Sequence, residues 1–282
     1  MKLWTIYRKE DIERNKRFIE LLNEACKEFN IENIIITYEN ISFGVINNEL
    51  KLIYNNELVS DYPDGVINRT NDYLISKQLE LKGIRCFNNS FLTQVANNKN
   101  LCYQYVNQAN VKIQDTLFNS SHGLTFPLVF KNPKGRGGNE VYLVTDEETL
   151  NKLKNKYKEY TLQSLCWSMT PKDLRVYVIN NKIVTAVLRK GIEDFRANYS
   201  ISKSAELYEL NEQQIEYINR IISLFSIDYA GIDFLVNDQD ELIFNEIEDS
   251  VGARALYELS DINIAYLYIK HIYNELSKQG VF

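Results

Sequence analysis

The spacing of hydrophobic and polar residues over the first ninety-odd positions predicts a small open α/β sheet. Residues 11–29 repeat apolar side chains on one helical face. The pair Asn47-Asn48 separates two runs of β-forming residues, which predicts a hairpin over 41–54. Further strands are expected at 2–8, 34–38, 65–70 and 83–88, with a second helix at 71–82.

The pattern changes after a helical stretch at about 92–108, and longer strands around a glycine cluster begin near residue 125. The change predicts a domain boundary near residue 96, with domains 1–96 and 97–282, and a mixed α/β (α+β) fold class. The elements expected in the second domain are strands at 125–133, 140–145, 160–165, 173–179, 182–189, 229–236 and 241–247, and helices at 146–158, 211–225 and about 260–278.

Composition and charge narrow the class of protein. The 282 residues are 45% hydrophobic and carry a net charge of −6, as in many globular proteins. An acidic chain argues against general nucleic-acid binding, which needs clustered Lys and Arg. The sequence shows neither a secretory core nor an apolar run of membrane-spanning length, so we expect a cytoplasmic protein that binds no membrane.

The cysteines and histidines are few and scattered. Four cysteines with no CxxC spacing and two isolated histidines predict neither a zinc site nor a disulfide framework. Any metal ion is therefore expected to be held by carboxylates.

A glycine-rich segment, FKNPKGRGGNEVYLV at 130–144, is the first candidate for chemistry. Its glycines allow backbone N–H groups to approach phosphate oxygens, and its cations supply positive charge. The residues in question are Lys131, Lys134, Arg136, Gly135, Gly137 and Gly138. The segment is not a P-loop, because the GxxxxGK[ST] order is absent. A solvent-exposed hairpin turn is the alternative.

Three carboxylates follow near the end of the chain, in AGIDFLVNDQDELIFNEIEDS at 230–250. If residues 237–240 form a four-residue loop, Asp233 pairs with Phe244, and Asp233, Glu246 and Glu248 share one face. Such crowded carboxylates repel one another unless a cation neutralises them, and oxygen ligands suit Mg²⁺ or Mn²⁺. The opposite face is expected to bury Ile232, Phe234, Val236, Ile243 and Ile247. The alternative is an exposed acidic hairpin.

Several arginines lie at 173–200, between the glycine-rich segment and the three carboxylates. Arg175 and Arg189 lie on the two arms of a predicted hairpin with Asn180-Asn181 at its turn, and Arg196 and Asn198 follow in a polar loop. Arginine can fix a carboxylate or stabilise charge on a transferring phosphoryl group. Surface ion pairs are the alternative.

Taken in order, these motifs resemble the ATP-grasp superfamily, most closely its RimK-like glutamate-ligase branch, over roughly residues 66–260. Lys99 and Lys131 match the two phosphate-contacting lysines, and KGRGG matches the mobile glycine-rich loop. LQSL at 162–165 matches the strand that meets adenine, while DLR at 173–175 and DFRAN at 194–198 match the D-x-R and D-F-R-x-N motifs. Asp233, Glu246 and Glu248 fall on the three metal-ligand positions.

The resemblance implies an ATP-grasp fold, in which a small N-terminal α/β domain precedes two α+β subdomains, about 97–162 and 163–282, that clasp ATP. It also implies an ATP-dependent carboxylate–amine ligase that forms an amide through an acyl phosphate and releases ADP and phosphate. The implied cofactors are ATP with Mg²⁺ or Mn²⁺. The implied partners are a carboxylate substrate, whether small molecule, peptide or protein terminus, and an amine such as an amino acid; a homo-oligomer is compatible.

Each candidate residue has a role under this resemblance. Metal ligands are Asp233, Glu246 and Glu248; ATP contacts are Lys99, Lys131, Gly135, Gly137, Gly138, Gln163 and Leu165; catalytic groups are Arg175, Arg189 and Asn198; substrate contacts are Arg196 and Arg254. Capping of a helix start is an equal alternative for Arg254.

Two departures from the branch keep other functions open. Glu248 stands where the branch usually has Asn, and SISKSAE replaces the paired glycines expected after DFRAN. Glutamate as the incoming amine is therefore not implied. The alternatives are a small-molecule kinase that stops at phosphoryl transfer, and a nucleotide-binding regulatory protein without turnover.

Overall fold

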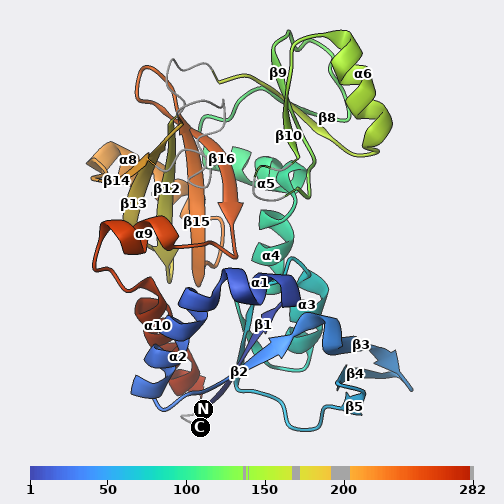
Figure 1. The fold of residues 1–282 in the computed structure, drawn as a ribbon, viewed down its shortest axis with the longest axis vertical. Helices are drawn as coiled ribbons and strands as arrows, with labels where there is room; N and C mark the ends of the chain where they lie inside the picture. The colour runs from blue at the N-terminus through green and yellow to red at the C-terminus, as the bar shows by residue number, and fades with distance from the viewer. Residues whose placement is uncertain (136–137, 139, 167–171, 192–203, 280–282) are drawn as a thin grey trace.

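The computed structural model describes residues 1–135, 138, 140–166, 172–191 and 204–279 (Figure 1). The helices among them are α1 (Lys9–Arg14), α2 (Lys16–Glu28), α3 (Tyr73–Leu81), α4 (Ser90–Ala96), α5 (Lys99–Val106), α6 (Glu147–Lys156), α8 (Glu212–Ile222), α9 (Arg254–Leu259) and α10 (Ile264–Gln279). The strands are β1 (Lys2–Tyr7), β2 (Glu32–Thr37), β3 (Ile41–Ile46), β4 (Glu49–Tyr54), β5 (Glu57–Leu58), β6 (Gly65–Asn68), β7 (Arg85–Phe87), β8 (Thr116–Phe118), β9 (Leu128–Lys131), β10 (Val141–Val144), β11 (Thr161–Ser164), β12 (Lys172–Ile179), β13 (Lys182–Lys190), β14 (Ser204–Tyr208), β15 (Tyr229–Val236) and β16 (Leu242–Glu248).

A parallel sheet in the order β2-β1-β6-β7 forms the N-terminal part of the molecule. Successive side chains point to opposite faces, so Leu3 packs with α2 while Trp4 packs with α3 in a separate cluster. Burial on both faces explains the apolar runs that the sequence shows at these strands. The hairpin of β3 and β4 turns at Asn47 and Asn48, both with positive φ, as the Asn-Asn pair predicts.

An antiparallel sheet in the order β14-β13-β12-β15-β16 forms the largest layer. One face packs against α8, whose start is fixed by a capping box between Asn211 and Gln214. The predicted turn at Asn180-Asn181 joins β12 to β13, again with positive φ at both residues. A smaller sheet, β10-β9-β11-β8, lies with α6 at the top of Figure 1. Neither β8 nor β14 was expected from the sequence.

The helix expected at about 260–278 is present as α10, and a short helix that was not expected, α9, precedes it. Ser260, with extended backbone geometry, ends α9. The long helix α10 packs against α2 from the start of the chain, and both contribute to one core with Tyr177 and Tyr229 of the large sheet. Figure 1 shows α10 beside α2 at the lower left. The N-terminal sheet and the large sheet therefore share a core.

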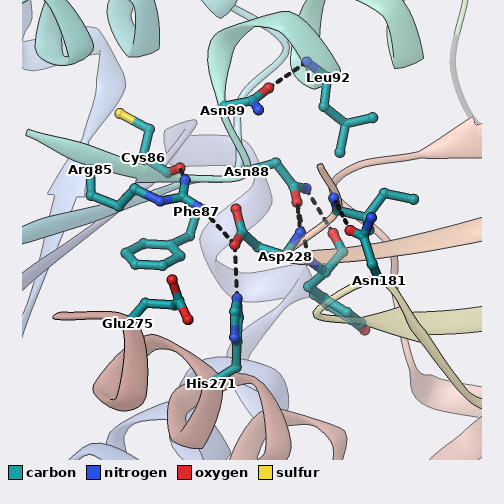
Figure 2. A network of polar contacts seen from close by, with 12 residues as sticks. Arg85, Cys86, Phe87, Asn88, Asn89, Leu92, Asn181, Asp228, His271 and Glu275 are labelled. Carbon is teal, nitrogen blue, oxygen red and sulfur yellow. Dashed lines mark hydrogen bonds and ion pairs between the residues drawn. The ribbon is translucent and has the colours of Figure 1, made fainter. Parts of the chain in front are cut away.

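Buried polar contacts tie the N-terminal sheet to the large sheet (Figure 2). Asn88, just after β7, accepts hydrogen bonds from the backbone N–H groups of Asp228 and Tyr229 at 2.8 and 3.0 Å. Its amide nitrogen donates to the carbonyl oxygens of Tyr229 and Asp249. Asp228 in turn contacts Arg85 at 2.7 Å and His271 of α10 at 2.8 Å. These contacts fix the segment after β16 against the N-terminal sheet.

Over the ranges that the structure describes, no helix combines the length and apolar character needed to cross a bilayer.

Candidate active site

The three predicted carboxylates lie together on one face of the β15–β16 hairpin. One oxygen from each of Asp233, Glu246 and Glu248 lies within 4.8 Å of the others. Hard oxygen ligands at this spacing are the type that Mg²⁺ or Mn²⁺ binds.

The strand register that places them differs from the expected one. Val236 pairs with Leu242, so the loop is one residue longer than predicted. By itself, this extra residue would move Glu246 and Glu248 to the face opposite Asp233. A bulge at Asn245 restores the shared face: Phe234 pairs with Phe244, and Asp233 pairs with Glu246 rather than with Phe244. Ile243 pairs with Leu235 and so lies on the Asp233 side, not on the opposite face as predicted. The other four apolar residues of that prediction join the core against α8.

Two buried arginines neutralise the carboxylate cluster. Arg175 contacts both oxygens of Asp233, at 2.8 and 2.6 Å, and Glu248 at 2.7 Å. Arg189 contacts Asp233 at 2.9 Å and forms a second ion pair with Asp173. Burial opposes the charge on Asp233, which is 2% exposed, but the two guanidinium groups outweigh burial and lower its pKa to about 2. Arg175 and Arg189 are therefore ion-paired within the protein, at the wall of the site.

Lysines join the glycine-rich segment to the same cluster. Lys99, at the start of α5, contacts Glu246 at 3.1 Å and donates to the carbonyl oxygen of Gly135 at 2.8 Å. Lys131, at the end of β9, donates to Asn245 at 3.0 Å and to the Tyr103 hydroxyl at 3.2 Å. Burial lowers the pKa of Lys131 to about 8, so the protein interior disfavours its charge.

A cleft of about 530 Å³ lies where the N-terminal sheet, the large sheet and the glycine-rich segment meet. Among the predicted residues it is lined by Lys99, Gly135, Gly138, Arg175, Arg189, Glu246, Glu248 and Arg254. Eight cationic side chains but only four carboxylates line it, although the whole chain is acidic. The cleft therefore suits an anionic ligand.

Several predicted residues lie elsewhere. Gln163 is buried in β11, where it donates to Thr116 at 2.8 Å, and Leu165 is half-buried just after that strand. Neither these two residues nor Lys131 lines the cleft. Gly137, Arg196 and Asn198 lie outside the described residues.

Arg254 is exposed at the start of α9 and lines the cleft. The residue before it makes no side-chain capping bond, and the structure shows no capping contact from Arg254 itself within the described residues.

The residues that the N-terminal part contributes to the cleft belong to no motif and were not predicted from the sequence. Tyr7 ends β1, and Arg69 follows β6 directly; α1 and α2 add Arg14 and Arg17. The carboxyl ends of adjacent parallel strands are common ligand sites in open α/β sheets. That rule, applied to the predicted strands at 2–8 and 65–70, would have pointed to Tyr7 and Arg69.

Comparison with known proteins identifies the class. The RimK-like ATP-grasp domain family matches residues 93–272. The chain belongs to this family, which confirms the resemblance seen in its motifs and its assignment as an ATP-grasp enzyme.

Relatives match along nearly the whole chain. An uncharacterized Mycoplasma pneumoniae protein, the MG011 homolog, is 28% identical over 99% of this chain and 96% of its own length. Human beta-citrylglutamate synthase B is 24% identical over 94% of this chain and 75% of its own length.

Solved structures confirm the fold. A RimK domain protein of Sphaerobacter thermophilus aligns with a TM-score of 0.75 at 11% identity, covering 96% of this chain and 99% of the other. D-alanyl-alanine synthetase A of Vibrio cholerae aligns with a TM-score of 0.70 at 14% identity, covering 98% of both chains. The predicted ATP-grasp architecture is therefore correct.

Proposed function

We propose that this protein is an ATP-dependent carboxylate–amine ligase, which forms an amide or peptide bond through an acyl phosphate and releases ADP and phosphate. The observation that carries the proposal is the contact of Lys99 with both Glu246 and Gly135. That contact brings a carboxylate cluster, a lysine and a glycine-rich segment to one cleft, which is the set of groups that phosphoryl transfer needs. Related proteins named as ligases and synthases, such as the human and Vibrio cholerae enzymes, support the reaction class.

Charge neutralisation of the ATP phosphates is the proposed role of the two lysines. Lys99 reaches the cleft directly, and its ammonium already lies between Glu246 and the glycine-rich segment. Lys131 is buried and does not line the cleft, and its pKa is lowered, so a nearby phosphate would stabilise the charge that burial disfavours. Gly138 has a φ of +73°, which glycine adopts without strain, and the segment around it would cover the phosphates.

Two Mg²⁺ or Mn²⁺ ions are the proposed metal cofactors, and the residues fit them. Glu246 and Glu248 open onto the cleft, and Asp233 lies directly behind them. Asp233 has three hydrogen bonds from Arg175 and Arg189, so only part of its acceptor capacity is left for a metal. When bound, the ions would offset the negative charge of the ATP phosphates. A solved relative of the same fold is a complex with Mg and ADP.

The proposed reaction has two steps. A carboxylate oxygen of the acid attacks the γ-phosphorus of ATP, the bond to the β-phosphate oxygen breaks, and ADP leaves with that electron pair. The amine then attacks the acyl carbon, the carbon–oxygen bond to phosphate breaks, and the amine nitrogen loses a proton. Arg175 and Arg189 lie at the cleft wall, where their positive charge would favour the phosphoryl group in transfer. No side-chain nucleophile is needed.

The test is a screen of pooled carboxylates and amino acids with ATP and Mg²⁺. We expect ADP and phosphate to form only when an acid and an amine are both present. AMP and pyrophosphate would contradict the mechanism. Equal ADP release without an amine would indicate a kinase, and ATP binding without turnover in any mixture would indicate a regulatory protein.

A further inference from the structure

The strand β16, which carries two of the three site carboxylates, leaves the large sheet directly after Glu248. The pairing of β15 with β16 ends at Gly231 and Glu248, whereas β15 continues to pair with β12 as far as Tyr229. The two strands of the carboxylate hairpin therefore separate at this point. The next residues, 249–252, lie outside the strands, and three of them line the cleft.

One side chain, that of Asn88, bridges the two separating strands (Figure 2). Its Nδ2 donates to the carbonyl oxygen of Tyr229 at 2.7 Å and to that of Asp249 at 3.2 Å. Its Oδ1 accepts from the N–H group of Tyr229 at 3.0 Å. Asn88 is 4% exposed and follows β7 directly. A side-chain amide has the same donor and acceptor groups as a peptide unit, so Asn88 continues the hydrogen bonding where the pairing of β15 with β16 stops.

Side chains also hold the three carbonyl oxygens that follow. Arg69 donates to those of Ser250 and Val251, at 3.0 and 3.1 Å. The Tyr177 hydroxyl donates to that of Gly252 at 3.1 Å. Four successive carbonyl oxygens, from 249 to 252, thus each accept a hydrogen bond from a side chain. The position of this segment therefore depends on side chains from both the N-terminal sheet and the large sheet.

Close packing makes the carboxylate cluster sensitive to the position of this segment. A Cβ atom added to Gly231 would lie 2.7 Å from the Val251 side chain and 3.5 Å from that of Arg175. Val251 therefore lies tightly against β15, next to the arginine that contacts Glu248 at 2.7 Å. Because Asp249 is the chain neighbour of Glu248, a displacement of its peptide group also displaces Glu248.

We propose that Asn88 is a positioning residue for Glu248. Asn88 does not line the cleft; it acts through the peptide group of Asp249, which it ties to β15 and to the N-terminal sheet. This inference rests on the proposed ligase function and deepens it, because it makes the geometry of the proposed metal site depend on the N-terminal sheet. Groups that orient a metal ligand without touching the metal have large effects on metal affinity.

The first experiment measures metal binding without any turnover. Mn²⁺ is titrated into the full chain in the presence of a non-hydrolysable ATP analogue, and free Mn²⁺ is measured by electron paramagnetic resonance. We expect Asn88→Ala to lower the Mn²⁺ affinity about 10- to 100-fold. Arg85→Met is the matched control, because Arg85 joins the same sheets through Asp228 at 2.7 Å, while other side chains hold the carbonyl oxygens of 249–252. Urea denaturation should show lower stability for both variants, but Arg85→Met should keep nearly the wild-type Mn²⁺ affinity.

The second experiment uses the acid and amine that the screen identifies and varies the Mg²⁺ concentration. Asn88→Ala should raise the Mg²⁺ concentration needed for half-maximal ADP release, and excess Mg²⁺ should restore much of kcat. A residue that only stabilises the fold would lower the amount of active protein at every Mg²⁺ concentration. Tyr177→Phe removes only the hydroxyl that holds Gly252, four residues after Glu248, so we expect a smaller change in the same direction.

The outcomes separate the inference from the proposed function. A lower Mn²⁺ affinity in Asn88→Ala, without ADP release by the wild type in any mixture, would keep the positioning role and refute the ligase. Turnover with unchanged Mn²⁺ affinity and Mg²⁺ dependence in Asn88→Ala would keep the ligase and overturn the positioning role. An equal loss of Mn²⁺ affinity in Arg85→Met, or no Mn²⁺ binding by the wild type, would overturn it as well. If Asn88→Ala does not fold, Asn88→Ser, which has a shorter polar side chain, provides the same comparison.

Discussion

Replacing Lys131 by methionine tests how the protein holds a cation for ATP. Lys131 is 5% exposed, and its ammonium donates hydrogen bonds to Tyr103 and Asn245. Burial lowers the pKa of Lys131 from 10.5 to about 8, although the charge of Glu246 favours the protonated form. Methionine has a similar length and no charge, so Lys131→Met removes the buried cation and leaves most of the packing.

The size of the expected change in the free energy of unfolding follows from the pKa of Lys131. A lowering from 10.5 to about 8 corresponds to about 3 kcal/mol against the charged form in the folded state. The folded state loses stability from this group at every pH below about 8, and regains it as the pH rises from about 8 towards 10.5. Removing the ammonium leaves two acceptors unpaired, at a cost of about 1 to 3 kcal/mol each. That cost does not depend on pH, so the pH dependence isolates the charge.

The assay is urea denaturation of the two proteins at several pH values. The free energy of unfolding of the wild type, minus that of Lys131→Met, should rise by about 2 to 3 kcal/mol between about pH 7 and pH 10. Lys152→Met is the control, because Lys152 is a largely exposed helix residue paired with Glu148, and its difference should stay flat.

Bound ATP should oppose the effect of burial on the charge of Lys131. Its phosphates would favour the charged form of Lys131, so an ATP analogue should stabilise the wild type more than Lys131→Met. A stability difference that does not change with pH would refute the buried-cation reasoning. Equal stabilisation of both proteins by the analogue would refute the placement of Lys131 at the phosphates.

Three further substitutions test other parts of the site. Asp233→Asn leaves two buried arginines short of a carboxylate; denaturation should show about 3 kcal/mol lower stability at neutral pH, and ADP release should be lost. Because the pKa of Asp233 is about 2, its contribution is present above about pH 4 and should disappear as the pH falls towards 2. Arg254→Ala should raise the substrate KM and leave ATP affinity nearly unchanged in a binding titration; equal loss of both would contradict a substrate contact. In Gly231→Ala the new methyl group would lie 2.7 Å from Val251, so activity and melting temperature should both fall, while Gly44→Ala, with open space around it, should change neither.

Much of the fold could be predicted because local patterns and tertiary packing agree. The Asn-Asn turns and the apolar parallel strands follow from residue type and spacing, whereas the shared face of Asp233 with Glu246 and Glu248 depends on a bulge that offsets a longer loop. The bulge at Asn245 could not be predicted, since it lies beside a contact with a distant segment: the Phe244 N–H donates to the Lys112 carbonyl oxygen at 2.9 Å. Spacing within the hairpin carries no information about that contact.

In the candidate site, too, some residues could be predicted from the sequence and others could not. Residues within motifs, such as Lys99 and Glu246, could be found because their order along the chain is itself a signal. Arg69 and Tyr7 belong to no motif, and they reach the cleft only because the C-terminal helix α10 packs the N-terminal sheet against the large sheet. Their place at the cleft becomes visible only in three dimensions.

The most direct test of the central claim follows an oxygen atom. The acid identified in the screen is labelled with ¹⁸O in its carboxylate, and the released phosphate is analysed by mass spectrometry after one round of turnover with ATP, Mg²⁺ and the amine. An acyl phosphate requires that one labelled oxygen moves from the carboxylate to phosphate, so we predict phosphate with a single ¹⁸O. Phosphate without label, or label in AMP, would contradict the proposed reaction.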